Sequence, residues 1–343
     1  MIRCQVFNSE SIRRFHELSL FKYEERDDVS NVDFIRNKHL DNPDGSSLLL
    51  ELVESDEVTG RIVVLNRRSN SSTVGELVGN PVDLLSISKG PFGGISLYRE
   101  AIRKNQLVSC HGFFHTSNPK SEIFYRNALR MKPIFELDYR GLLISLPMRG
   151  FHFLVLNGLL QAANAGIIAL LKIIAGKSNV AISKVNDYKD DMLSEIPINQ
   201  DDQFLFRDAA RLNWRFKSIK GLPTYDKYIF SRANRSLGYL VTREINQNGF
   251  VGVVIVDYLF DSMSFRELAN VYLALFKEAG NANLIFTIGN FKNQKQKVLF
   301  TYPFVRIPKR FRPQAFPIYT PQSEAVPSLS INSYFTLFDL DVM

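Results

Sequence analysis

Two aspartates interrupt otherwise apolar, strand-like runs in this sequence. Asp257 lies in the run 250–259, and Asp83 lies at the matching place in the run 75–87. A carboxylate in such a run can act as the base that removes a proton from an attacking nucleophile. It can equally cap a neighbouring helix or pair with an arginine. The residues alone leave both roles open for both aspartates.

A glycine-containing turn between a predicted strand and a predicted helix is a second candidate site. It contains Lys89, Gly90, Gly93 and Gly94, and a helical pattern of apolar residues begins directly after it. Backbone N–H groups at the start of a helix attract anions, and the ammonium group of Lys89 would add positive charge. The turn is therefore either an anion site or only a connection from strand to helix.

The elements around Asp257 follow a definite order. The region 207–261 opens with a short helical segment that carries Trp214, the only tryptophan. Three strand-like runs follow, and the last is almost wholly apolar and β-branched, which is typical of a strand covered on both faces. Ser262 or Ser264 as N-cap, with Glu267 in the first turn, then starts a helix. The predicted strands are 225–231, 236–244 and 250–259.

This order of helix, three antiparallel strands and helix resembles the core of an acyl-CoA N-acyltransferase (GNAT) domain. Finer detail is similar to the second half of tandem GNAT-like proteins that are associated with bacterial surface-polysaccharide clusters. The matching segments are Leu-Asn-Trp-Arg-Phe at 212–216, Pro-x-Tyr at 223–225, Gly-Tyr-Leu-Val-x-Arg at 238–243, Val-Asp at 256–257 and Asp-x-Asp at 339–341.

The first part of the chain repeats this plan and resembles the first half of the same proteins. Its matching features are an Asn-Pro-x-Gly turn at 42–45 and a Gly-Arg-Ile-Val-Val strand at 60–64. The resemblance implies an α/β fold with mixed sheets, built as two tandem GNAT-like domains joined by an apolar linker helix. The implied division is 1–147 for the N-terminal domain, 148–184 for the linker helix, and 185–343 for a C-terminal domain that ends in a basic, proline-rich segment and a strand.

The resemblance implies acetyl-CoA or another acyl-CoA as co-substrate, with its pyrophosphate held by the turn at 88–94. The family pattern is Gln/Arg-x-x-Gly-x-Gly/Ala. This sequence departs from it, because Gly90 stands at the Gln/Arg position and Ile95 at the Gly/Ala position. Pro91 also removes one N–H donor. The implied cofactor-binding residues are Lys89, Gly90, Gly93, Gly94 and Asn118.

The resemblance also implies catalytic residues. In the family pattern Asn…Tyr-x-x-Leu-Gly-Phe the tyrosine protonates the departing thiolate, and Asn118 and Tyr125 are the nearest matches. Tyr125 is one residue out of register, which is a rotation of about 100° on a helix, and Arg130 replaces the glycine. The base is expected on the fourth strand of a unit, which gives Asp83 and Asp257. No metal site is expected.

The run 150–171 has no charged residue in 22 positions, which is long enough to cross a bilayer. Asn157, Gln161 and Asn164 fall on one helical face. A spanning helix would place two matched units on opposite sides of a membrane. We therefore expect a linker helix packed between the domains, and a helix lying on or in the membrane surface is the alternative.

Charge and cysteine content bound the partners and the compartment. The chain has two cysteines and no visible secretory signal, which favours a cytoplasmic protein, peripheral at the inner face of a membrane if the apolar helix touches lipid. The net charge of +7 is local, because 281–322 holds seven basic residues and no acid. This segment suits the phosphates of CoA, a nucleotide-sugar or a lipid headgroup. No nucleic-acid module accompanies it, so nucleic acid is not the expected partner.

Three functions remain open from the sequence. The first is a CoA-dependent N-acyltransferase, most simply an acetyltransferase, that acts on an amino sugar or another small-molecule or glycan-precursor acceptor. The glycine turn of the first half is altered, and the second half has no such turn. Both observations also fit the second function, a catalytically degenerate GNAT-fold interaction or regulatory protein of a polysaccharide-assembly system. The third is an aminoacyl-tRNA-dependent transferase of the peptidoglycan-bridge type. Whether either half is an active enzyme stays open.

Overall fold

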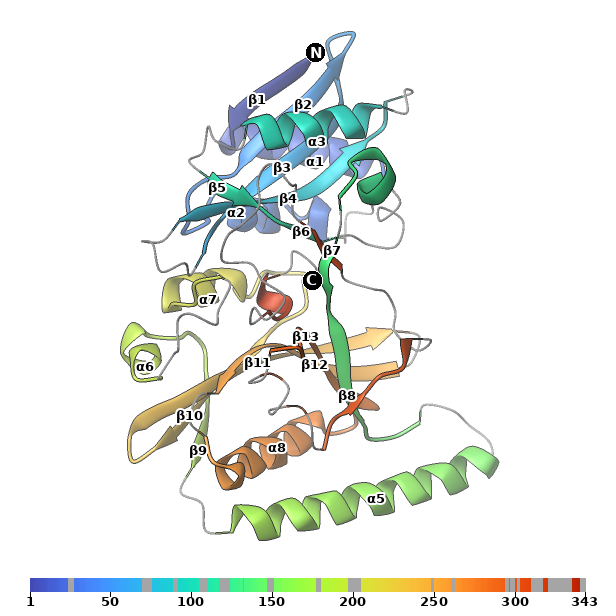
Figure 1. Ribbon diagram of the computed structural model, residues 1–343, viewed down its shortest axis with the longest axis vertical. Helices are drawn as coiled ribbons and strands as arrows, with labels where there is room; N and C mark the ends of the chain where they lie inside the picture. The colour runs from blue at the N-terminus through green and yellow to red at the C-terminus, as the bar shows by residue number, and fades with distance from the viewer. Residues whose placement is uncertain are drawn as a thin grey trace.

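The computed structural model gives one chain of two stacked units (Figure 1). The described residues are 1–23, 28–69, 76–88, 92–104, 110–116, 124–131, 133–146, 151–176, 180–196, 205–247, 250–260, 263–293, 296, 300, 303–309, 317–319 and 335–339.

The first unit contains a five-stranded sheet in the order β1-β2-β3-β4-β5. Strands β1 to β4 are antiparallel, and β5 is parallel to β4. Helices α1 and α2 cover one face, and α3 covers the other (Figure 1). The bounds are β1 Ile2–Val6, α1 Ser9–Leu20, α2 Val32–His39, β2 Leu48–Glu54, β3 Glu57–Arg68, β4 Leu77–Ser86, α3 Gly93–Lys104 and β5 Cys110–Phe113.

Alternate side chains of this sheet enter two different cores. Leu50 and Leu52 of β2 pack with Leu97 of α3, whereas Leu49 packs with Phe15 of α1 on the opposite face. Successive side chains of a strand point to opposite faces, so a sheet covered on both sides needs apolar residues at nearly every position. This explains why these strands read as continuous apolar runs.

The second unit contains a seven-stranded sheet in the order β14-β8-β13-β12-β11-β10-β9. Strands β9 to β12 are antiparallel, and β13 is parallel to β12, as β5 is to β4. The predicted tandem arrangement of two mixed sheets is therefore confirmed. The bounds are β8 Asp138–Leu143, α5 Phe151–Ala175, β9 Ala181–Val185, α6 Asp190–Ser194, α7 Ala209–Arg215, β10 Asp226–Arg232, β11 Arg235–Gln247, β12 Phe250–Phe260, α8 Phe265–Ala279, β13 Leu284–Gly289 and β14 Val305–Arg306.

The two units exchange strands, which the predicted boundaries at 147 and 185 do not allow for. Strand β8 precedes residue 147 but pairs with β13 in the second sheet. In return β15 (Pro317–Tyr319) lies between β6 (His115–Thr116) and β7 (Pro133–Glu136) beside the first sheet. Figure 1 shows β8 running from the upper unit into the lower one. Each unit is therefore completed by a strand from the other part of the chain.

Helix α5 does not pack between the units, and this part of the prediction is wrong. It lies along α8 at the far end of the second unit (Figure 1). Strand β8 before it and β9 after it belong to the same sheet, separated by four strands. A helix of 25 residues is about 37 Å long, which is enough to cross that sheet. The segment Leu154–Ala175 has the length and composition of a membrane-spanning helix, and 11% of it is buried.

The C-terminal part of the chain also differs from the prediction. A final strand was expected after residue 333, but Leu337–Asp339 form a 3₁₀ helix. The basic segment is partly neutralised, because Arg306 lies 2.9 Å from Asp138 and Lys309 lies 3.4 Å from Glu136. Lys295, Lys297, Arg310 and Arg312 lie outside the described residues.

Candidate functional site

The first candidate site is the edge of β4 that β5 leaves uncovered. Among the described residues, β5 pairs with β4 only as far as Gly79, whose carbonyl also accepts from Phe114 N at 3.0 Å. Beyond this point β4 holds an extra residue opposite β3, and Asp83 has a φ of +53°. Such a bulge bends a strand and is common beside active sites. Among the described residues, the pairing of β4 with β5 thus ends at Gly79, which makes the backbone of 80–86 the candidate stretch for a ligand.

Helix α3 begins directly against the end of this strand because of Gly93. A Cβ atom on Gly93 would lie 2.9 Å from Ser86 Oγ and 3.0 Å from Leu52 Cδ2, so only glycine fits without a shift. A Cβ on Gly94 would have Leu84 Cδ2 as its nearest described neighbour, at 4.0 Å. The first N–H groups of a helix have no intrahelical partner and attract anions. Gly93 and Gly94 thus fit the predicted anion site, whereas Lys89 and Gly90 lie outside the described residues.

The second unit has a bulge at the corresponding place but a different helix start. Strand β12 holds Val256 as an extra residue opposite β11, beside Asp257. Helix α8 is capped by Ser264, and Glu267 accepts from Ser264 N at 2.7 Å. Although burial opposes its charge, the hydrogen bonds from Ser264 hold the pKa of Glu267 below its usual range. A carboxylate already occupies this helix start and would repel a second anion. Of the two helix starts, that of α3 is therefore the one that fits the predicted anion site.

Asp83 is held by two cationic or polar side chains from the end of α2. Lys38 Nζ lies 2.9 Å from Asp83 Oδ2, and His39 Nε2 lies 2.9 Å from the same oxygen. Burial opposes the charge on Asp83, but Lys38 and the hydrogen bond from His39 outweigh it and hold the pKa of this carboxyl well below its usual range. A general base works best with a pKa near the operating pH. The geometry therefore favours a positioning role, in which Asp83 fixes the bulge of β4 to α2.

His39 extends this cluster into a Ser–His–Asp line that sequence spacing did not reveal. Its Nδ1 lies 3.2 Å from Ser47 Oγ, while its Nε2 faces Asp83. The three residues come from separate segments, which is why no local motif signals them. Ser47 and His39 have no exposed surface, so the Ser47 hydroxyl cannot meet a substrate as a nucleophile. These three side chains form a buried hydrogen-bonded chain that holds β4 against the end of α2.

Asp257 lies in a fully buried polar network and has no exposed surface. It accepts from Tyr239 Oη at 2.7 Å and from Thr336 Oγ1 at 2.6 Å. Arg207 Nε lies 3.4 Å from its carboxylate, and Arg207 Nη2 reaches Asp339 at 2.6 Å. Burial raises the pKa of Asp339, and Arg207 opposes this effect. The contacts give Asp257 the structural role that the sequence left open, as a tie between β12 and the C-terminal segment.

Tyr125 lies in the aromatic core of the first unit, on a π-helical turn (Phe124–Ala128). Its ring is 5.3 Å from that of Tyr98 and 6.0 Å from that of Tyr319, and 3% of the residue is exposed. Burial raises the pKa of its hydroxyl well above the usual value, which makes it a weaker acid. The surroundings favour a packing role over proton donation. The other implied residue of this motif, Asn118, lies outside the described residues.

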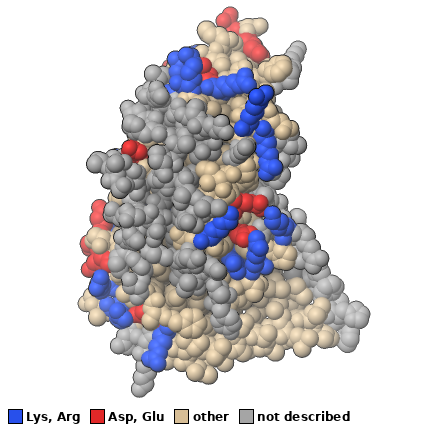
Figure 2. All heavy atoms as spheres, in the orientation of Figure 1, with Lys and Arg blue, Asp and Glu red and all other residues tan. Residues whose placement is uncertain are grey.

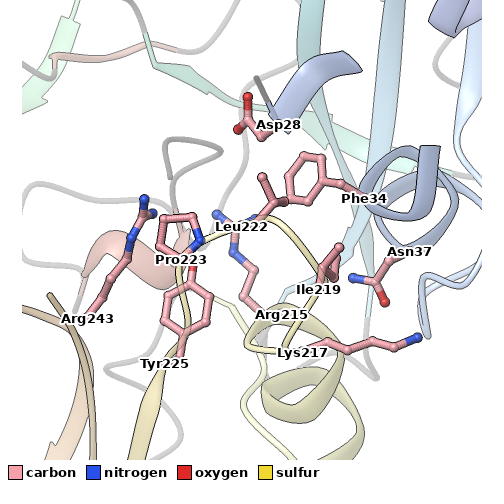
Figure 3. Close-up of a pocket in the computed structure, with 10 residues that line it drawn as sticks. All are labelled: Asp28, Phe34, Asn37, Arg215, Lys217, Ile219, Leu222, Pro223, Tyr225 and Arg243. Atoms are coloured by element: carbon pink, nitrogen blue, oxygen red, sulfur yellow. The ribbon is translucent and has the colours of Figure 1, made fainter. Parts of the chain in front are cut away.

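A cavity between the two units is the second candidate site, and the sequence did not predict it. Its volume is about 240 Å³. The first unit contributes Asp28 and two residues of α2, and the second unit contributes the end of α7, the segment that follows it and one residue of β11 (Figure 3). Three of the segments that carry the family resemblance meet at this cavity. They are 212–216, 223–225 and 238–243, which supply Arg215, Tyr225 and Arg243. The full lining is Asp28, Phe34, Asn37, Arg215, Lys217, Ile219, Leu222, Pro223, Tyr225 and Arg243.

Comparison with known proteins places the fold. No family model and no curated protein matches the sequence. Solved structures with a similar fold include a GCN5-related N-acetyltransferase from Anabaena variabilis, at 9% identity and a TM-score of 0.60, covering 93% of this chain and 72% of that one. A probable N-acyltransferase from Enterococcus faecalis has a TM-score of 0.61 at 11% identity, with coverage of 93% and 72%.

A eukaryotic enzyme matches over the whole chain. The N-myristoyltransferase of Saccharomyces cerevisiae, solved with bound myristoyl-CoA, has a TM-score of 0.57 at 10% identity. The match covers 100% of this chain and 85% of the yeast protein. At these identities the likeness concerns the fold. The chain therefore has the mixed α/β fold of the GNAT-like N-acyltransferases, with the sheet present twice in tandem.

Proposed function

We propose that the protein is an acyl-CoA-dependent N-acyltransferase whose donor site lies in the first unit. One observation carries the proposal: the uncovered edge of β4 leads from the Asp83 bulge to the glycine start of α3. An extended donor fits this path, with its pantetheine arm along 80–86 and its pyrophosphate at Gly93 and Gly94. The start of α8 already holds the Glu267 carboxylate, so the second unit is left for acceptor contacts.

The reaction requires a free amine and the acyl thioester. The amine nitrogen attacks the thioester carbonyl, a C–N bond forms, the C–S bond breaks, and the CoA thiol leaves with the proton that the amine loses. Backbone N–H groups on the uncovered edge of β4 can donate to the oxyanion that develops on the carbonyl. Because these donors are fixed by the strand, they need little reorganisation during the reaction.

The acceptor and the acyl group belong to the same proposal. An amino sugar or another surface-glycan precursor is the acceptor that the motifs at 212–216 and 238–243 favour, by resemblance alone. Acetyl is the smallest acyl group, and the structural neighbours include enzymes named for acetyl and for myristoyl transfer. A panel of acyl-CoA donors of increasing chain length would identify the preferred group.

A catalytically degenerate protein is the second candidate, and one observation favours it. The two carboxylates expected as bases are both engaged in ion pairs, Asp83 with Lys38 and Asp257 with Arg207. Such a protein would bind acyl-CoA without transferring the acyl group, or would not bind it. An aminoacyl-tRNA-dependent transferase is less supported, because Arg306 and Lys309 of the basic segment pair with acids of the same chain.

Titration calorimetry with acetyl-CoA and longer acyl-CoA donors tests the proposal. Gly94→Asp places a carboxylate at the start of α3 without a described clash and should abolish binding, whereas Gly94→Ser should retain it. Phe265→Asp, at the first residue of α8, is the matched control and should bind like the wild type. Absence of binding to the wild-type protein at millimolar acyl-CoA would reject the enzyme. Binding without thiol release, across a panel of amines, would favour the degenerate protein.

A further inference from the structure

We infer that the cavity between the two units binds an anionic group, a phosphate or a carboxylate, on the acceptor. Among the described lining residues, three side chains are cationic, Arg215, Lys217 and Arg243, and one is a carboxylate, Asp28. Guanidinium groups bind phosphate and carboxylate oxygens through paired N–H donors. The excess of positive charge therefore selects an anion. The inference rests on the proposed function only in naming the ligand as the acceptor.

Tyr225 lies at the centre of this group of charges. The Arg243 guanidinium carbon is 5.9 Å from the centre of the Tyr225 ring. Burial raises the pKa of the Tyr225 hydroxyl, and Arg215 and Arg243 act against this effect, Arg243 also through a hydrogen bond. Both arginines are thus close to one hydroxyl that can itself donate to an anion. Figure 3 shows Tyr225 between Arg243 and Arg215.

Burial places both arginines where a ligand in the cavity could meet them. Arg215 is 5% exposed, and its position after Trp214 fixes it at the boundary between the units. The Nε of Arg243 is buried and has no hydrogen-bond partner among the described residues. A buried donor without a partner is costly to a fold, and a bound oxygen would satisfy it. This makes Arg243 the residue to test.

The rest of the lining suits a small ring that carries the anion. Four lining side chains are apolar, and Asn37 lies beside Ile219 (Figure 3). The amide nitrogen of Asn37 bonds the Trp214 carbonyl, so its amide oxygen is the atom left for a ligand. A volume of about 240 Å³ lies below the range of about 300–1,000 Å³ that is usual for ligand pockets, and it suits a monosaccharide better than a nucleotide-sugar. The apolar residues are Phe34, Ile219, Leu222 and Pro223.

Binding of four probes to the full-length protein tests the inference without CoA: glucosamine, glucosamine 6-phosphate, glucuronate and inorganic phosphate. We expect at least one anionic sugar to bind at least tenfold more tightly than glucosamine, and that sugar identifies the group as phosphate or carboxylate. Arg243→Met should weaken this binding at least tenfold and Arg243→Lys should restore part of it. Arg235→Met, an exposed arginine at the start of the same strand, is the matched control and should not change it.

The outcomes separate this inference from the proposed function. Equal affinity for glucosamine and its phosphate, or unchanged affinity in a folded Arg243→Met variant, would overturn the anion site. Binding of inorganic phosphate alone, with the same affinity in Arg243→Met, would also overturn it. If the anionic sugar binds as expected but no acyl-CoA binds, the cavity stands and the transferase proposal fails. If acyl-CoA binds and no anionic sugar does, the transferase proposal stands and the anion site in the cavity fails.

A second inference rests on α5, whose polarity is inverted for a helix in water. Asn157 and Asn164 face the protein, where their side chains bond the backbone of 143–146 at 2.6 to 3.2 Å. Leu154, Leu159 and Ile173 face outward with exposures of 68%, 65% and 77%. Exposed apolar patches of this kind mark contact surfaces. Figure 2 shows that this end of the molecule has few charged side chains on the face in view.

We propose that this face lies on an anionic lipid bilayer. The sequence from 147 to 177 holds three basic residues and no acid, which complements negative headgroups. Both ends of α5 lead into strands of one sheet, so the helix can lie along the membrane surface but cannot span it without breaking that sheet. Its inner face packs on α8, and the protein itself thus supplies the polar side that an interfacial helix needs.

Flotation with phosphatidylcholine vesicles, with and without phosphatidylglycerol, tests the bilayer proposal. The wild-type protein should float with the anionic vesicles, and Leu154→Glu with Leu159→Glu should reduce the floating fraction at least fivefold. Val6→Glu, an exposed apolar residue on β1 that is 56% exposed, is the control and should float like the wild type. A protein that stays unbound with both vesicles, or that forms a dimer lost on Leu159→Glu, would overturn the proposal.

Discussion

Asn37 and Trp214 bond each other twice across the boundary between the two units. The Trp214 indole Nε1 donates to the Asn37 carbonyl at 2.6 Å, and Asn37 Nδ2 donates to the Trp214 carbonyl at 3.1 Å. The indole also packs in the core of the first unit, although α7 belongs to the second. Together with the exchange of β8 and β15, this contact makes the two units depend on each other.

The first prediction is that the two units unfold as one. Trp214→Phe removes a buried donor and part of a buried ring, and should lower the free energy of unfolding by about 2–4 kcal/mol. Urea unfolding should show one transition, with the emission of the single tryptophan coinciding with the far-ultraviolet circular dichroism. Asn270→Ala, whose amide bonds Arg266 at an exposed site, should change stability by less than about 0.5 kcal/mol. Two separate transitions in the wild-type protein would contradict the prediction.

The Lys38–Asp83 pair predicts a specific response to acid. The folded pKa of Asp83 lies below its ordinary value of 3.8, so the pair stabilises the fold above that pH. This contribution is lost as pH falls below it toward the folded pKa. Asp83→Asn leaves Lys38 buried without its counter-charge and should cost about 3–5 kcal/mol at pH 7. Urea unfolding at several pH values should show that the free energy of unfolding falls less below pH 4 in the variant than in the wild type. An equal fall in both proteins would contradict the assignment.

A substitution at Asp257 tests whether this residue has a structural or a catalytic role. Asp257→Asn removes one of the two buried carboxylates that pair with Arg207, while Asp339 remains as a counter-charge. The variant should lower the free energy of unfolding by about 1–3 kcal/mol. The rate of thiol release per folded molecule should stay within about threefold of the wild type, because Asp257 has no exposed surface. A stable variant that has lost at least a hundredfold in rate would instead make Asp257 catalytic.

Removing the Tyr125 hydroxyl should have little effect on stability or on the rate of thiol release. Tyr125→Phe keeps the ring that packs between Tyr98 and Tyr319 and removes only the buried hydroxyl. We expect a stability change of about 1 kcal/mol or less and a rate of thiol release within about threefold of the wild type. The rate should be measured with saturating donor. A tenfold or larger fall in kcat, without loss of fold, would restore Tyr125 as the acid.

The local elements could be predicted from the sequence because their signals are local. The three runs around Asp257 form β10 to β12, and Ser264 with Glu267 caps α8 as predicted. Helix α3 also begins at Gly93, where the sequence predicted a helix after a glycine turn. Periodicity, capping residues and glycines act over a few neighbouring residues, so each can be read without knowing the fold.

The remaining features depend on contacts between distant parts of the chain. Strand β15 has three residues, and nothing within them indicates that they complete the first unit. The partners of Asp83 and Asp257 come from segments far away in sequence. The residues next to each aspartate therefore could not show whether it acts as a base or forms an ion pair. The apolar run of α5 was recognised, but its outward-facing side depends on where β8 and β9 enter their sheet.

The position of the CoA pyrophosphate in a structure of the complex tests the central claim most directly. The account predicts the pyrophosphate at the N-terminus of α3, against Gly93 and Gly94, with the pantetheine arm beside 80–86 of β4. A pyrophosphate at the start of α8, or in the cavity lined by Arg215 and Arg243, would contradict it.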